Sequence, residues 1–128
     1  MMKLGYHEPR PFWITTNIQA FSCSSQFGNP SGHSSSSMGM AMVVWLDYLI
    51  ESEWYLIERR KIFEFLLAFA FGCTVGYSRM FLGVHSLDQV VYGILIGIWC
   101  AFTLQFCVRP VLTQEAQDLV CGNIIEYK

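Results

Sequence analysis

The sequence has few charged residues. Asp, Glu, Lys and Arg make up only 14% of its 128 residues, whereas soluble proteins carry about 25%. Apolar residues account for 53% and aromatic residues for 16%, a composition typical of integral membrane proteins. A net charge of −2 provides no basic face for nucleic acid, so we expect no such partner. The length allows one domain at most.

The cysteines lack the spacing of a metal site. Three of the five, Cys73, Cys100 and Cys107, lie within apolar runs, so we interpret the cysteines as packing residues rather than disulfides or ligands. Residues 1–10 are polar and have no apolar core of the kind that a cleavable signal peptide requires. Membrane insertion is therefore expected to rely on internal apolar segments, or on sequence upstream of Met1.

Three apolar runs are candidates for membrane spans. The first, Met38 to Ile50, is interrupted by Asp47 and extends weakly to Ile57; it can span a membrane only if Asp47 faces other helices. The second run covers residues 62–77 and carries Glu64 near its start. We assign no role in the chemistry to either carboxylate.

The third run, residues 90–108, has no charge along 19 residues, close to the roughly 20 needed to cross a bilayer. Arg109-Pro110 is expected to end this span and to leave 111–128 as a polar, acidic tail that is helical in part. Near the N-terminus, Pro11 to Ile14 predicts a short helix at the membrane interface, because Pro suits a first helical position and Trp prefers the interface. Residues 22–37 predict a loop whose last serines cap the next helix.

The basic residues predict an orientation. Glu58-Arg59-Arg60-Lys61 is expected to form a basic turn between the first two spans, on the same side as Arg109. Positive residues favour the cytoplasm. The 52 residues from His33 to His85 suit two crossings and a turn, so both histidines are expected on the opposite, lumenal or extracellular face. The endoplasmic reticulum would fit this arrangement.

Three short polar motifs stand beside these apolar runs. Charged groups near a bilayer cost free energy and usually serve a function. The motifs are, in order, Lys3 with Arg10-Pro11, then Pro30-Ser31-Gly32-His33, and then Ser78-Arg79 with His85.

The side chains of these motifs suit phosphate hydrolysis without a metal. Such a site needs positive charge, a nucleophile, a proton donor and backbone donors. The Ser31 hydroxyl and the Gly32 amide can donate hydrogen bonds, and imidazoles such as His33 and His85 can act as acid or nucleophile near neutral pH. The cationic side chains available for the phosphoryl oxygens are Lys3, Arg10 and Arg79.

From Lys3 to about Gly97, the motifs and the spans between them resemble the type 2 phosphatidic acid phosphatase superfamily. That superfamily includes glucose-6-phosphatases and vanadium haloperoxidases. The resemblance implies an all-α, multi-pass transmembrane helical bundle. Three spans of a six-helix core are present here with an interfacial helix before them, and the helices normally upstream are missing. Residues 1–110 would form the membrane phosphatase core, incomplete at its N-terminus, and 111–128 the tail.

The resemblance also implies a role for each motif residue. His85 would attack phosphorus to give a phosphohistidine, and His33 would protonate the leaving group. Lys3, Arg10 and Arg79 would bind the phosphate, with neither metal nor cofactor.

One position departs from the family pattern. An aspartate usually follows the nucleophile by four residues and orients its imidazole. Here Gln89 stands at that offset and Asp88 at an offset of three, and on a helix beginning near His85 either could reach the ring. Glucose-6-phosphatases also carry glutamine there, so activity is compatible with the change.

The expected function is therefore hydrolysis of a lipid phosphate, such as phosphatidic acid or a polyprenyl or sphingoid phosphate, by an enzyme in the bilayer. A sugar phosphatase like glucose-6-phosphatase is the alternative, favoured by Gln89 and by residues 10–13. A vanadate-dependent haloperoxidase is disfavoured because those enzymes are soluble. A non-catalytic membrane protein that keeps a phosphate pocket is the remaining alternative.

Overall fold

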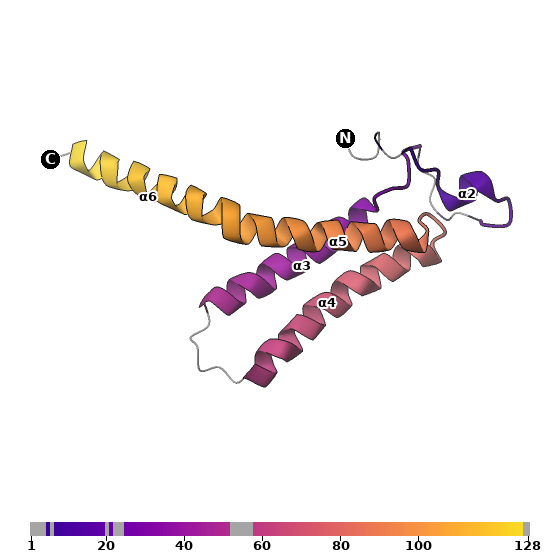
Figure 1. Cartoon of the computed structure of the whole chain (residues 1–128), viewed down its shortest axis with the longest axis horizontal. Coiled ribbons are helices and arrows are strands. Elements are labelled where there is room, and N and C mark those ends of the chain that lie inside the picture. Colours follow the sequence, from indigo (N-terminus) through magenta and orange to yellow (C-terminus); the bar gives the residue numbers. More distant parts are fainter. Residues whose placement is uncertain (1–4, 6, 20, 22–24, 52–57, 127–128) are drawn as a thin grey trace.

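The computed structural model describes residues 5, 7–19, 21, 25–51 and 58–126. This part of the chain is helical and contains no strand, which confirms the all-α fold (Figure 1). The elements are α2 (Pro11–Ile14), α3 (Gly32–Glu51), α4 (Glu58–Phe81), α5 (Leu87–Thr103), the π-helical turn η1 (Leu104–Val108) and α6 (Arg109–Glu126).

Helix α3 is the centre of the bundle. It packs against both α4 and α5, which contact each other less extensively. In Figure 1 the start of α3, the end of α4 and the start of α5 lie toward the same end of the molecule as α2. The continuous rod of α5, η1 and α6 runs from that end to the C-terminus on the opposite side.

The core consists of one face of α3 and the α5 residues opposite it. Met38, Met42 and Leu46 follow one another at intervals of four residues, so they line one side of the helix, and they are buried with Ala101 of α5. Many large apolar side chains of α4 and α5 point outward instead, including Phe63, Leu67, Phe71, Leu95 and Trp99. An apolar exterior of this kind is what a lipid environment requires.

Two glycines allow α5 to approach α3 closely. A Cβ atom at Gly93 would lie 2.6 Å from the carbonyl oxygen of Ser31, and one at Gly97 would lie 2.4 Å from that of Ser35. These are backbone atoms, so any larger side chain would separate the helices. The spacing Gly93-x-x-x-Gly97 is a known signal for close packing of membrane helices, and it is the feature of the sequence from which this contact could have been predicted.

Two helical stretches of the described chain are long and apolar enough to cross a membrane. They are Arg59–Phe81 and Leu87–Cys121, which correspond to the second and third predicted spans. The first predicted span lies on α3, which is not one of them: its first turns are polar, and Asp47 interrupts the apolar residues that follow.

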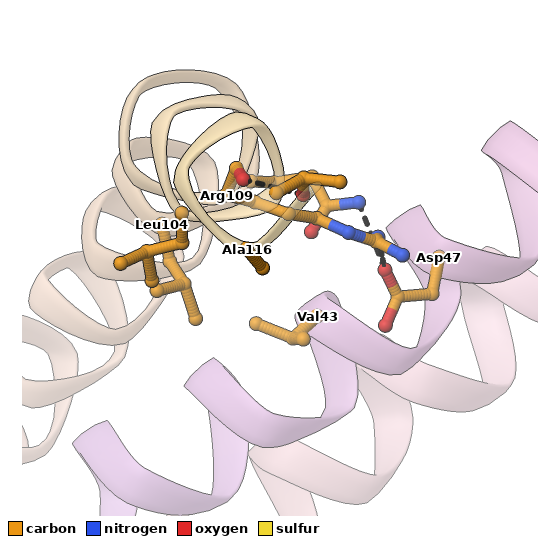
Figure 2. A pocket seen from close by; sticks show the side chains of 8 residues that line it. Val43, Asp47, Leu104, Arg109 and Ala116 are labelled. Carbon is orange, nitrogen blue, oxygen red and sulfur yellow. Dashed lines mark hydrogen bonds and ion pairs between the residues drawn. The ribbon is translucent and has the colours of Figure 1, made fainter. Parts of the chain in front are cut away.

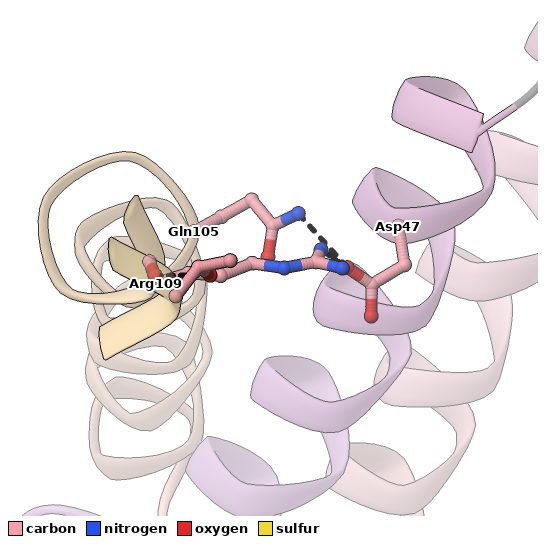
Figure 3. A network of polar contacts seen from close by, with 4 residues as sticks. Asp47, Gln105 and Arg109 are labelled. Carbon is pink, nitrogen blue, oxygen red and sulfur yellow. Dashed lines mark hydrogen bonds and ion pairs between the residues drawn. The ribbon is translucent and has the colours of Figure 1, made fainter. Parts of the chain in front are cut away.

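Asp47 does face another helix, as a span at this position requires. Its Oδ1 accepts a hydrogen bond from Gln105 Nε2 at 2.8 Å and forms an ion pair with Arg109 Nη1 (Figure 3). Gln105 lies in η1 and Arg109 begins α6. The second carboxylate of the apolar runs, Glu64, pairs with Arg60 on the surface of α4 at 3.1 Å.

The predicted basic turn is wrong in its position. Residues 58–61 form the first turn of α4, and residues 52–57 before them lie outside the described part. The four glutamate, arginine and lysine side chains favour helix over turn, since none is a helix breaker.

The helix does not break at Arg109-Pro110 but continues to Glu126, which confirms that the tail is helical in part. Proline lacks an N–H and its ring crowds the carbonyl four residues earlier. Here the wider turn of η1 precedes the proline, and the Arg109 N–H donates to the carbonyl of Leu104 five residues back. Pro110 then occupies the first turn of α6, where proline is tolerated.

Candidate active site

The turn after α4 returns the chain beside Arg79. The Gly83 N–H donates to Met80 O at 2.9 Å, and the Val84 N–H donates to Arg79 O at 3.3 Å. Gly83 has φ 69°, a left-handed conformation that glycine adopts without strain. This is the Schellman arrangement of a helix C-terminus. It buries Val84 completely and carries His85 back toward the last turn of α4.

Arg10 reaches this turn from the N-terminal segment. Its side chain is 4% exposed. Nε donates to Gln26 O at 2.8 Å, and Nη1 donates to Val84 O at 3.0 Å, immediately before His85. Burial, and after it the charge of Arg79, lowers the pKa of Arg10. Two guanidinium groups are therefore held close enough to repel each other, and an anion between them would relieve that repulsion.

Arg79 has an unused donor. Its Nε is buried and has no hydrogen-bond partner within the described residues. Buried polar atoms are nearly always paired, and an exception needs an explanation. An oxyanion bound at this end of α4 would supply the missing acceptor, and the planar fork of arginine matches phosphate oxygens.

Gln89 contacts the ring of His85. The two side chains are 1% and 4% exposed, and Oε1 of Gln89 lies 3.2 Å from Nδ1 of His85. The amide Nε2 donates to Pro9 O at 3.1 Å, so the amide nitrogen is turned away from the imidazole. With an oxygen facing it, Nδ1 is the nitrogen that carries the proton in a neutral ring.

The Gln89 backbone also holds the segment before α3. The Ser31 N–H donates to Gln89 O at 3.1 Å. The Ser31 hydroxyl lies 2.9 Å from that of Ser34, and both serines are fully buried. Gly32 and His33 follow in the first turn of α3; they are exposed and line a cavity of about 430 Å³.

The sequence matches a known protein family. A family model described as the PAP2 superfamily matches residues 1–111. The chain belongs to the PAP2 superfamily. Phosphatidylglycerophosphatase B of Bacillus subtilis (strain 168) is 28% identical over 81 residues, which are 63% of this chain and 39% of that protein. No solved structure matches the chain.

PAP2 membership confirms the resemblance inferred from the motifs, all of which fall within the matched residues. The structure places Arg10, Arg79, His85 and Gln89 in one region through the contacts given above. Lys3, the remaining cation of the PAP2 motifs, lies outside the described residues.

The two residues that could orient His85 differ in their contacts. Gln89 contacts the His85 ring, whereas the side chain of Asp88 is exposed and lines, with Glu8 and Gln89, a cavity of about 370 Å³. His7 is exposed, as expected. The edge of its ring meets Phe27 at a centroid distance of 5.0 Å.

The expected capping by Ser34 to Ser37 is wrong. These serines lie inside α3, which begins at Gly32, and the Ser35 N–H donates to the carbonyl of Ser31 at 3.0 Å. The helix therefore starts earlier than the apolar pattern indicates. His33 lies in its first turn and lines a cavity with Val75 of α4.

Sequence reasoning missed the contributions of main-chain groups and of one glycine. The carbonyls of Pro9 and Val84 accept the hydrogen bonds of Gln89 and Arg10, and backbone acceptors leave no residue pattern. Gly28 gives the Gln89 amide its space, since a Cβ there would lie 2.4 Å from Oε1. In the sequence, this role of Gly28 is indicated only by its position in the loop before the second PAP2 motif.

Proposed function

We propose that this PAP2 protein is a metal-independent membrane phosphatase that acts on a phosphomonoester or diphosphate of a lipid through a phosphohistidine. One observation carries the proposal. A buried arginine donates to the carbonyl of the residue before a buried histidine, and Nδ1 of that histidine contacts an amide oxygen. A second arginine, in the last turn of α4, has a buried Nε with no partner among the described residues. That set provides an oxyanion site and a nucleophile without a bound cation.

In the first step, Nε2 of His85 attacks phosphorus while Nδ1–H donates to Gln89. The Arg10 and Arg79 side chains stabilise the charge on the equatorial oxygens. Lys3 is proposed as a third cation. The Gly32 amide in the first turn of α3 is proposed as a backbone donor, and the Ser31 hydroxyl can join it only by exchanging its bond to Ser34.

The bond from phosphorus to the leaving oxygen breaks as the bond to His85 forms. His33, protonated, donates its proton to that oxygen and becomes neutral. A water molecule then attacks phosphorus and gives a proton to His33, while the bond from phosphorus to Nε2 of His85 breaks. Inorganic phosphate leaves, and both histidines return to their starting states.

The proposed substrate class is a phosphorylated lipid. Support comes from the PAP2 family, from the two apolar helices and from the name of the Bacillus relative. Phosphatidylglycerophosphate therefore joins phosphatidic acid and polyprenyl or sphingoid phosphates as a substrate to be tested. The site lies at the ends of apolar helices, where a lipid headgroup can enter from the bilayer.

A sugar phosphate is the second candidate. The contact between Gln89 and His85 supports it, since the resemblance links glutamine at this position to glucose-6-phosphatases. Turnover of glucose 6-phosphate and of phosphatidic acid, measured on the same preparation, decides between the two.

Vanadate and a chelator test the proposed chemistry. Vanadate mimics the pentacoordinate transition state, so it is expected to inhibit lipid phosphate hydrolysis competitively, whereas EDTA is expected to leave the rate unchanged. Inhibition by EDTA that is reversed by a divalent cation would contradict metal independence. Activity that survives in His85→Ala would contradict the phosphohistidine.

A further inference from the structure

A groove lies between α3 and the rod formed by α5, η1 and α6, at the end away from His85. Its middle part is a cavity of about 560 Å³ whose lining includes Val43, Asp47, Leu104 and Arg109 (Figure 2). A cavity of about 400 Å³ adjoins it and shares Val43 and Leu104. A third, of about 680 Å³, shares Arg109 and lies along α6.

The lining of this groove changes from apolar to polar along its length. The part between α3 and α5 is lined by Met40, Val44 and Ala101 among other apolar residues. Along α6 the groove meets glutamine side chains and Asp118. An elongated site with one apolar and one polar end matches an acyl chain joined to a headgroup. A sugar phosphate or another small polar molecule would leave the apolar part unused.

The ion pair between Asp47 and Arg109 lies where the middle part of the groove meets the polar part, and it has hydrogen-bonding atoms that no described residue occupies. Gln105 and Arg109 both donate to Oδ1 of Asp47 (Figure 3). Within the described residues, Oδ2 accepts no hydrogen bond and Nε and Nη2 of Arg109 donate none. The side chains of Arg109 and Asp47 are 42% and 40% exposed. One further acceptor and several further donors are therefore available to a ligand.

The charges of the lining favour one class of headgroup. Among the described lining residues, Asp47 and Asp118 are negative and Arg109 is positive. An anionic headgroup would add charge to a site that already carries an excess of carboxylate. A zwitterionic headgroup places its phosphate at the guanidinium and its ammonium at the carboxylates, so both ends are paired.

We propose that this groove binds one zwitterionic phospholipid, with its headgroup at Asp47 and Arg109 and an acyl chain along α3 and α5. The site is separate from the proposed active site. Gln89 and Gln105 lie on one continuous helix sixteen residues apart, which is about 24 Å at 1.5 Å per residue. Binding here does not depend on the proposed chemistry at His85.

Native mass spectrometry of the full chain, released from detergent with added lipid, tests the proposal. Phosphatidylethanolamine is expected to bind at one per chain and more tightly than phosphatidylglycerol. Asp47→Asn and Arg109→Gln remove one charge each and should weaken binding about tenfold, the loss of one charge-assisted hydrogen bond. Arg60→Gln is the matched control, because it removes one charge from an exposed pair that lines none of these cavities.

A second measurement covers variants that fold poorly. Val43→Phe fills the middle of the groove without changing a charge and should also reduce phosphatidylethanolamine binding. A photoreactive residue in place of Leu104 should crosslink to phospholipid. Equal binding by Asp47→Asn and the control, preference for phosphatidylglycerol, or crosslinking of Leu104 to a second polypeptide would each overturn the proposal. The same lipid binding in His85→Ala is expected, whatever its phosphatase activity.

Discussion

The substitution Gly28→Ala should reduce the activity that depends on His85, although the added methyl group does not contact His85. The Cβ of alanine at this position would lie 2.4 Å from Oε1 and 2.6 Å from Nε2 of Gln89, closer than side-chain atoms approach one another. A flexible side chain usually moves aside at little cost. The Gln89 amide is 1% exposed and bonded at both ends, so it can move only by losing these contacts.

The size of the effect follows from the hydrogen bonds to His85 and Pro9, the two shortest of the three that the Gln89 side chain makes; the third, from the Ser86 N–H to Oε1, is 3.4 Å long. Displacement lengthens the 3.2 Å contact to His85 and the 3.1 Å contact to Pro9. Each buried hydrogen bond contributes about 1 kcal/mol net. A loss of about 2 kcal/mol in the transition state corresponds to about a 30-fold fall in kcat/KM. The free energy of unfolding should fall by about 1–3 kcal/mol, as is typical of overpacking.

The assay combines lipid phosphate hydrolysis in detergent micelles with thermal unfolding of each variant. Gly5→Ala is the matched control, since no described residue other than its chain neighbours lies within 4 Å of its added methyl. Gln89→Ala should reduce the rate by itself, and it also vacates the space that the methyl at residue 28 would occupy. Adding Gly28→Ala to Gln89→Ala should therefore change kcat/KM by less than about twofold, because neighbouring residues that act through one contact are not additive.

Two outcomes would refute this reasoning. Gly28→Ala could behave like Gly5→Ala, which would mean that the amide is free to move. Alternatively, the penalties of Gly28→Ala and Gln89→Ala could add in full, which would mean that the glycine acts on the site by another route. The 15N chemical shifts of the His85 ring give an independent readout, since they report whether Nδ1 carries the proton.

The remaining predictions concern the two histidines and the orientation of the chain. His85→Ala should abolish turnover of every substrate and formation of any phosphoenzyme. His33→Ala should reduce hydrolysis of alkyl phosphates by about 10²–10⁴-fold, the usual contribution of proton donation, and affect aryl phosphates much less; equal losses on both substrates would contradict its role as an acid. A glycosylation acceptor placed in residues 22–37 should be modified during membrane insertion, and one in residues 52–57 should not. The reverse pattern would show that the histidines face the cytoplasm.

Much of the site could be predicted from sequence because its cations and histidines stand out beside apolar segments. Arg79 and His85 are conspicuous between two such runs, and the offset of four residues places Gln89 on the His85 face of a helix. The spacing did not exclude Asp88 as the residue that orients His85. The carbonyl of Pro9 distinguishes Gln89 from Asp88, because it accepts a hydrogen bond from the Gln89 amide and holds that side chain in the site. A backbone acceptor of this kind cannot be predicted from a residue pattern.

The helix boundaries were harder to predict for the opposite reason, since local signals were overridden. Arg109-Pro110 has the composition of a helix stop, yet η1 accommodates the proline and the ion pair with Asp47 holds Arg109 on α3. The serines before Met38 have the composition of a loop, yet Ser34 and Ser37 are buried in the helix interface. In both cases a tertiary contact outweighs the preference of the segment itself.

The π-helical turn sets the rotation of everything that follows it. Its register is that of an α-helix carrying one inserted residue, and each residue of an α-helix turns the chain by about 100°. The wider turn takes up that extra residue within itself, so the helix that follows keeps the facing it would have without the insertion. Arg109 therefore still points to Asp47, although a proline follows it. One residue can be gained at this place in the rod without turning the far end of the molecule away from α3.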